Sequence, residues 1–214
     1  KDLTCELAMK LGRAAAAVLT NKSTRHPRVI IGKDTRLSSD MLENAMAAGL
    51  CSVGASVVLL GVVPTPAVAY LVEKYKADAG IMISASHNSY EYNGIKIFSG
   101  DGFKLPDDLE ERIESLILGE APLPAAPADS DLGTVETAPN ALRDYIDPVK
   151  STVHFSLDGL EIALDCANGS SAMTAETLFT ELGAKVHMLA NEPNGVNIND
   201  GCGSTHMEKL IEYV

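Results

Sequence analysis

The sequence contains no tryptophan, and aromatic residues make up only 5% of its 214 residues. Apolar residues nonetheless reach 46%, which is enough to build a core in a chain of this length. Small aliphatic side chains with few aromatic ones suit buried parallel strands that alternate with helices. We therefore expect a globular α/β protein.

Basic side chains are also scarce, since 17 Lys and Arg residues stand against 29 Asp and Glu residues, for a formal net charge of −12. This excess of negative charge argues against nucleic acid and against an anionic membrane surface as the main partners. An anionic small molecule would need a locally basic pocket. The candidates for its cations are Lys33, Arg36, Lys96 and Lys104.

The four cysteines, Cys5, Cys51, Cys166 and Cys202, have neither the CxxC spacing of zinc sites nor the density of a disulfide framework. Long apolar runs are absent as well: no stretch approaches the length that spans a bilayer. The N-terminal residues include acidic ones where a signal peptide would be basic and apolar. These absences predict reduced thiols and a cytoplasmic protein that does not enter a membrane.

The chemically most unusual stretch is Ser84–Asn88. The apolar run before it, Ala79–Ile83, has the length and β-branched content of a buried strand and stops abruptly in small polar residues. The dipeptide Asn93-Gly94, which favours the positive φ angles of tight turns, precedes a second apolar run at 95–98. We therefore expect Ser86 at the C-terminal end of a strand, in a loop held at both ends. An ordinary surface connection is the alternative interpretation.

Ser86 beside His87 suggests a nucleophile next to a base, but adjacent residues on an extended chain point to opposite sides. The loop amides and Lys96, which strand alternation returns toward the loop, better suit a phosphoryl group, because that group needs fixed N–H donors and cations. Serine hydrolase chemistry has less support, since the chain has no G-x-S-x-G elbow and no credible triad.

Apolar patterns of strand and helix alternate along the rest of the chain. Strands are expected at 28–32, 55–60, 79–83, 95–98, 160–164 and 185–189, with an edge strand at 133–137. Helices are expected at 3–19, 41–53, 106–118, 140–153 and 206–214. Two more are expected, one that begins at about residue 66 and one that ends at residue 182. This order predicts two mixed, mostly parallel three-layer α/β/α domains, residues 1–153 and 154–214, the second incomplete in this chain.

Two polar loops are expected near Ser86. The residues from Lys33 to Arg36 follow a strand, and ligands gather at the C-terminal ends of strands in open α/β sheets. A simple ion pair of Asp34 with Arg36 is the alternative there. We also predict that Asn168 and the loop 191–205 lie on the Ser86 side, the alternative for the loop being a mobile surface segment.

Several of these motifs together resemble the α-D-phosphohexomutases, and in particular their phosphoglucosamine mutase branch, in which the serine of Ser-His-Asn carries the transferable phosphate. The motifs are Ser86-His87-Asn88, Gly32-Lys33-Asp34-Thr35-Arg36, Pro64-Thr65-Pro66, Ala167-Asn168-Gly169 and Asn199-Asp200-Gly201-Cys202-Gly203-Ser204-Thr205-His206. The resemblance covers nearly the whole chain. One departure is Ser89, where the family usually has Pro; its loss frees φ and restores an N–H donor.

The resemblance implies an isomerase-class phosphotransferase that interconverts glucosamine 6-phosphate and glucosamine 1-phosphate in peptidoglycan precursor synthesis. Phosphorylated Ser86 would phosphorylate the sugar, and the bisphosphate intermediate would return its other phosphate to Ser86. The implied catalytic residues are Ser86, Lys96 and His87, and the implied phosphate or substrate contacts are Arg36, Asn88 and Lys33. Mg²⁺ would bind the phosphate on Ser86 together with aspartates outside this chain, and a hexosamine 1,6-bisphosphate would act as activator.

The resemblance also implies the N-terminal portion of a longer enzyme, which would be inactive by itself, and it allows a homodimer. Two alternatives stay open. The chain is a noncatalytic domain pair that binds a sugar phosphate or a partner subunit, or it belongs to a mutase for glucose or mannose phosphates, because the sugar-selecting domain lies outside it.

Overall fold

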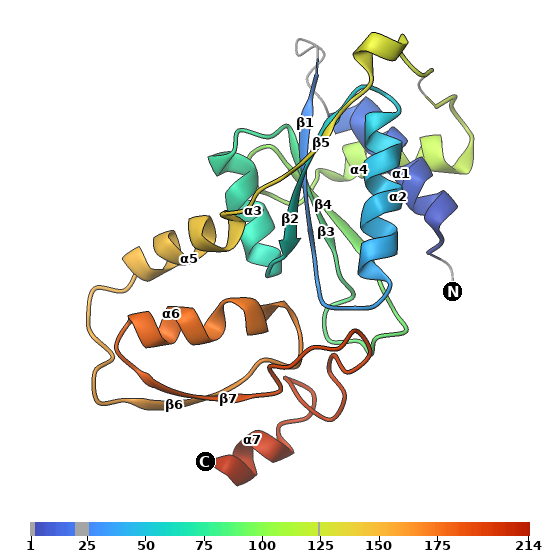
Figure 1. Ribbon diagram of the computed structural model, residues 1–214. Helices are drawn as coiled ribbons and strands as arrows, with labels where there is room; N and C mark the ends of the chain where they lie inside the picture. Colours follow the sequence, from blue (N-terminus) through green and yellow to red (C-terminus); the bar gives the residue numbers. More distant parts are fainter. Residues whose placement is uncertain (1–2, 20–25, 124) are drawn as a thin grey trace.

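The computed structural model describes residues 3–19, 26–123 and 125–214 and divides the strands between two sheets (Figure 1). The first sheet has the order β4-β3-β1-β2-β5, and the second pairs β6 with β7. The strands are β1 Arg28–Lys33, β2 Ser56–Val62, β3 Ala79–Ile83, β4 Ile95–Ser99, β5 Val135–Thr137, β6 Glu161–Asp165 and β7 Lys185–Leu189. Within the described ranges, no helix combines the length and apolar character needed to cross a membrane.

Helices cover both faces of the first sheet (Figure 1). One face carries α1 Cys5–Leu19, α2 Ser39–Cys51 and α4 Asp107–Leu118, and the other carries α3 Thr65–Lys74 and α5 Ala141–Ser151. Every pairing in this sheet is parallel except that of β4 with β3. The predicted fold class, a mostly parallel α/β/α arrangement, is confirmed.

Side-chain alternation along the inner strands explains the three layers. Val29 and Ile31 of β1 pack with α1 and α2, whereas Ile30 between them packs with α3. All five residues of β3 are buried, as expected for a strand covered on both faces. The loop that carries Ser86 therefore leaves from a rigid inner strand.

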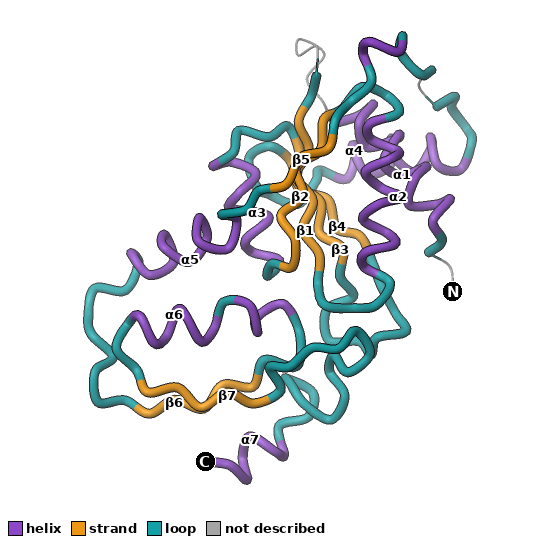
Figure 2. The backbone as a smooth tube through the Cα atoms, in the orientation of Figure 1, coloured by secondary structure: helices purple, strands orange, loops and turns teal. Residues whose placement is uncertain are grey.

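The second sheet is small and lies beyond the C-terminal ends of the parallel strands β1, β2 and β3 (Figure 2). The predicted helix before residue 182 is divided into a 3₁₀ turn, η2 Ser170–Met173, and α6 Ala175–Glu181, both on the side facing the first sheet (Figure 1). The last helix, α7 Glu208–Tyr213, is shorter than predicted and contacts β6. The division into domains at 153/154 stays a prediction.

Ion pairs connect α5, in the part of the chain up to residue 153 (the first half), with α6, in the part from residue 154 on (the second half). Glu181 of α6 accepts hydrogen bonds from the Nη atoms of Arg143 at 2.7 and 3.0 Å. It also forms an ion pair with Lys150, which lies in α5 like Arg143. The hydrogen bonds from Arg143 and Lys150 lower the pKa of Glu181 to about 2. The helix that leads out of the first sheet is thereby tied to the layer that covers the second.

Candidate active site

Ser86 lies in the exposed loop between β3 and β4 and has a left-handed backbone, with φ +56°. Non-glycine residues rarely adopt this conformation, and those that do cluster at functional sites. Among the described residues, six non-glycine positions have positive φ, and five of them lie in loops where the two halves meet. Those five are Ser86, Ala167, Asn168, Ala190 and Asn199.

The loop of Ser86 is closed at its ends, as predicted, but by a different geometry. The Ser84 N–H donates to the Gly94 carbonyl at 2.9 Å. Asn93 and Gly94 were expected to have positive φ, and that expectation is wrong. Instead, the Asn93 side chain donates to the hydroxyls of Ser38 and Ser39 at 2.9 and 3.1 Å, which ties the loop to the start of α2.

Arg36 holds the serine loop from the first half of the chain. Its Nη2 donates to the carbonyl oxygens of Ser86 and Asn88 at 3.1 and 2.5 Å, while Nη1 binds the Asp34 carboxylate. Both partners of this ion pair are buried, and Asp34 also accepts a hydrogen bond from Ser39 at 2.9 Å. The predicted proximity of this loop to Ser86 is confirmed, and so is the Asp34–Arg36 pair. Because the Nη atoms already bind carboxylate and carbonyl oxygens, Arg36 as a phosphate contact stays a prediction.

The second half reaches the same loop. The Asn199 Nδ2 donates to the Ser86 and Asn88 carbonyls at 3.0 and 2.9 Å, and the Thr35 hydroxyl donates to the Asn168 carbonyl at 2.6 Å. The predictions that Asn168 and the loop 191–205 lie on the Ser86 side are confirmed. The sequence motif contained Asn199, but its contact was not foreseen, since no local pattern shows which loop a side chain meets.

Asp165 and Asn168 stiffen the loops of the second half. Asp165 accepts hydrogen bonds from the N–H groups of Ala167 and Gly203, both at 2.8 Å. Asn168 donates to the Asn197 carbonyl at 3.2 Å. Because the bonds of Asp165 with Gly203 and of Asn168 with Asn197 join segments far apart in the sequence, they fix the loop that presents Asn199.

Three other predicted site residues, Lys33, Lys96 and His87, make no hydrogen bond to the serine loop in the described structure. Lys33 binds Asp40 at 2.6 Å and Glu43; burial lowers the pKa of Lys33, but these hydrogen bonds outweigh it and leave the pKa raised. Lys96 lies opposite Met82 in the β4–β3 ladder and is exposed, as is His87. In the described structure neither hydrogen-bonds to Ser86, so their roles stay predictions, and a serine hydrolase gains no support.

A magnesium ion would need ligands beyond those found here. Among residues 3–19, 26–123 and 125–214, no group of three or more His, Cys, Asp or Glu side chains is arranged to hold a metal. The carboxylate of Asp34, in the loop that contacts Ser86, is already engaged by Arg36 and Ser39. The described residues do not make a magnesium site by themselves.

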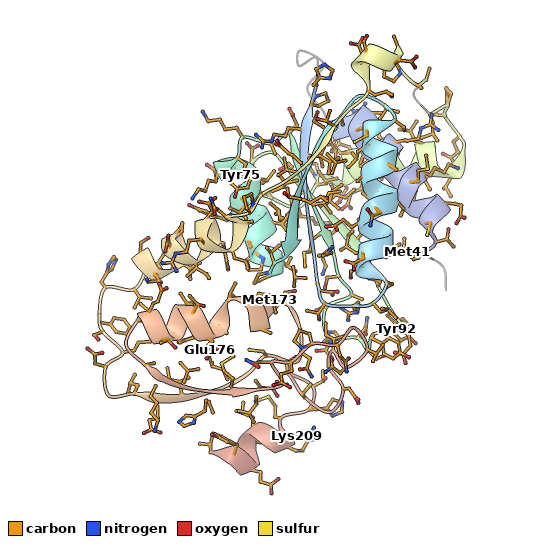
Figure 3. The ribbon with its side chains drawn as sticks, viewed as in Figure 1. Met41, Tyr75, Tyr92, Met173, Glu176 and Lys209 are labelled. Carbon is orange, nitrogen blue, oxygen red and sulfur yellow. The ribbon has the colours of Figure 1, made fainter. Side chains whose placement is uncertain are left out.

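Hollows at the junction offer room beside these residues. One of about 260 Å³ lies between the loop of Arg36 and the opposite half, where Met173, labelled in Figure 3, contributes to its wall. A groove of about 720 Å³ between α1, β4 and α4 is larger but lined mainly by aliphatic side chains. The strained backbones and converging donors favour the junction as the candidate site.

Comparison with known proteins agrees with this location. The family model for phosphoglucomutase/phosphomannomutase, alpha/beta/alpha domain I, matches residues 1–122. Phosphoglucosamine mutases from Clostridium novyi (strain NT) and Acetivibrio thermocellus are 54% and 53% identical over 213 residues, covering 100% of this chain and 47% of each relative. The chain thus spans about half the length of the curated relatives it matches.

Solved structures share the fold. A phosphoglucomutase/phosphomannomutase family protein from Burkholderia thailandensis superposes with a TM-score of 0.83 at 22% identity, covering 100% of this chain and 46% of that one. The phosphoglucomutase pp63/parafusin from Paramecium has a TM-score of 0.64 at 19% identity, with 97% and 43% covered. At these identities the likeness shows the fold alone.

Proposed function

Because the chain belongs to the phosphoglucomutase/phosphomannomutase family, we propose that it is part of a phosphohexomutase that interconverts glucosamine 6-phosphate and glucosamine 1-phosphate. The choice of glucosamine rests on the motifs of the sequence and on the names of relatives at 53–54% identity. A mutase for glucose or mannose phosphates is the alternative within the same chemistry.

The observation that carries the proposal is the fixed position of Ser86. Ser86 is exposed, and its backbone has the strained left-handed conformation. Its carbonyl oxygen accepts hydrogen bonds from Arg36 and from Asn199. Phosphoryl transfer depends mainly on positioning and electrostatic stabilisation, because the attacking and leaving oxygens must lie in line through the phosphorus. A serine held in this way can present a phosphate in one orientation to a sugar hydroxyl.

The proposed reaction begins with Ser86 phosphorylated. The bond from phosphorus to the serine Oγ breaks as a bond to a sugar hydroxyl forms, and the hydroxyl proton passes to a base, for which Lys96 and His87 are the candidates. The bisphosphate intermediate then reorients in the site, and its other phosphate is transferred to Ser86. Each cycle leaves the serine phosphorylated, so one phosphate is moved and none is consumed.

The cofactor, activator and assembly stay predictions. Mg²⁺ and a hexosamine 1,6-bisphosphate are implied by the resemblance alone, as are the homodimer and the cytoplasmic location. An anionic sugar phosphate as substrate fits a site that is open at the surface between the two halves.

The test is to replace Ser86 by Ala in the complete gene product and to measure mutase turnover and intact mass. We expect turnover to fall by at least about a thousandfold, because the phosphate carrier is lost, and the mass of one phosphate to disappear. Ser89→Ala, three residues away in the same loop, is the matched control and should keep both. Retention of the phosphate or of turnover in Ser86→Ala would exclude this serine as the carrier.

A noncatalytic sugar-phosphate-binding pair predicts a different result. The complete product would then bind the sugar phosphate without turning it over, and Ser86→Ala would leave binding unchanged.

A further inference from the structure

We propose that Asn199 is a positioning residue that orients Ser86 from the second half of the chain. This inference rests on the proposed mutase function, because the orientation matters when Ser86 transfers a phosphoryl group. Asn199 does not touch the reacting atoms; it acts through the backbone of the serine loop.

Two donors converge on the same two acceptors. The Nδ2 of Asn199 lies 3.0 Å from the Ser86 carbonyl oxygen and 2.9 Å from that of Asn88, and Nη2 of Arg36 lies 3.1 and 2.5 Å from the same atoms. A carbonyl oxygen has two lone pairs, and an amide nitrogen has two N–H groups, so all four bonds can form together. The Ser86–His87 and Asn88–Ser89 peptide groups are therefore held by both halves of the chain.

The backbone of Asn199 is shaped for this contact. Its φ is +59°, a conformation that Asn tolerates better than most residues, and its N–H donates to the Ala167 carbonyl at 2.9 Å. Glycine follows at positions 201 and 203, and the Gly203 N–H is bound by Asp165 at 2.8 Å. The side chain is thus aimed at the serine loop from a supported base.

The sequence of the serine loop makes an external hold more important. Ser89 follows Asn88 in this loop, so the loop lacks the restriction of φ that a proline ring at this position would supply. Arg36 and Asn199 restrict the preceding residues instead. Since only Arg36 belongs to the same half as Ser86, the hold is complete only while the two halves are docked.

The experiment compares Asn199→Asp with Asn194→Asp in the complete gene product. Asp keeps the shape and tolerates positive φ but has no N–H to donate. Asn194 undergoes the same chemical change in the same loop, and its Oδ1, which accepts from the Val196 N–H at 3.0 Å, stays an acceptor. We expect kcat of Asn199→Asp to fall about tenfold to a hundredfold with KM changed less than threefold, and Asn194→Asp to match the parent.

Two further measurements separate positioning from folding. Amide hydrogen exchange of residues 84–94 should become faster in Asn199→Asp than in Asn194→Asp, while the midpoint of thermal unfolding stays the same. Asn199→Gly, which keeps the left-handed backbone and removes the side chain, should behave like Asn199→Asp. Unchanged kcat in both Asn199 variants, or a loss of kcat matched by a lower unfolding midpoint without faster loop exchange, would overturn the proposal.

Failure of the mutase function itself would be visible separately. If the parent protein showed no turnover, the proposed function would fall, and loop exchange alone would decide whether Asn199 holds Ser86. Faster exchange in Asn199→Asp than in Asn194→Asp supports the hold, and equal exchange excludes it.

Discussion

At the scale of single residues, the buried ion pair of Asp34 and Arg36 supports the candidate site. The pair is out of contact with water, and its guanidinium also binds the serine loop. Charges buried in this way are tolerated only when both are present and hydrogen-bonded. The same side chains therefore support the fold and hold the loop of Ser86.

Removing one partner should be costly. We expect Arg36→Met to lower the free energy of unfolding by about 3 kcal/mol or more, because the Asp34 carboxylate would be left buried without its counter-ion. Urea unfolding of the chain measures this. Glu136→Gln, which breaks the exposed pair of Glu136 with Arg28, is the control and should cost less than about 1 kcal/mol. Equal losses in the two variants would mean that the Arg36 pair is no more important than a surface contact.

At the scale of elements, α1 and α2 pack closely against each other on one face of the first sheet, with small residues at their contact. A Cβ placed on Gly49 of α2 would lie 2.1 Å from the backbone oxygen of Met9 in α1, too close for any real contact. The two helices are buried against each other in the core that also covers β1 and β3. Glycine at this position is required by packing, although it is a poor helix former.

Gly49→Ala tests this packing against helix propensity. Propensity alone predicts a gain of about 1 kcal/mol, whereas separating the helices should cost about 1–3 kcal/mol, so we expect a net loss of stability. Asn44→Ala, on the exposed side of the same helix, gains propensity without a clash and should not destabilise. Thermal unfolding of both variants gives the comparison, and a stabilised Gly49→Ala would contradict the close approach.

The contact of α5 with α6 should be sensitive to acid. Hydrogen bonds from Arg143 and Lys150 lower the pKa of Glu181 from 4.5 to about 2. A carboxylate with a depressed pKa contributes its stabilisation above its unfolded pKa and loses it as the pH falls through the folded value. We therefore expect this contribution to be complete at pH 7 and to disappear between about pH 4.5 and 2.

Thermal unfolding of the parent and of Glu181→Gln at pH 7 and at low pH measures the effect. The difference between the two proteins should be present at pH 7 and shrink as Glu181 becomes protonated. Glu192→Gln, at an exposed position in the second half, is the control. A difference that did not change with pH would show that the ion pairs of Glu181 do not stabilise the fold.

At the scale of the whole molecule, the candidate site lies where loops from two separate sheets meet. The first half supplies Ser86 and Arg36, and the second supplies Asn199 through a different set of loops. The chain also covers only 47% of the length of relatives such as the Clostridium novyi phosphoglucosamine mutase. The family resemblance implies that further contacts to the sugar phosphate come from outside these 214 residues.

We therefore predict that residues 1–214 alone fold, at least in the predicted first domain, residues 1–153, but show no measurable mutase turnover. Lost electrostatic and positioning contributions, each on the order of several kcal/mol, lower a rate by many powers of ten. The assay compares this span with the complete gene product in the presence of Mg²⁺ and a bisphosphate activator, with circular dichroism as the check on folding. Turnover within about a hundredfold of the complete product would place a whole active site in this chain.

Strand and helix positions in this protein follow from local pattern. The run Ala79–Ile83 predicts β3 to the residue, because buried parallel strands are continuous apolar segments bounded by polar ones. The strand predicted at Lys185–Leu189, after Gly183, likewise coincides with β7. The final helix and the division into η2 and α6 were predicted less well, since helix ends depend on caps and contacts that a period does not contain. The family, too, could be recognised from motifs alone, and the match over residues 1–122 confirms it.

The sequence by itself therefore determined the α/β fold, the strand that delivers Ser86 and the family. Tertiary structure decided which side chains meet there. Arg36, whose role as a phosphate contact stays a prediction, binds two carbonyl oxygens of the serine loop, and Asn199, 113 residues from Ser86, joins it at those oxygens. Strand and helix periods are set by each residue's near neighbours, whereas hydrogen bonds between loops depend on how two sheets dock, which no local pattern encodes.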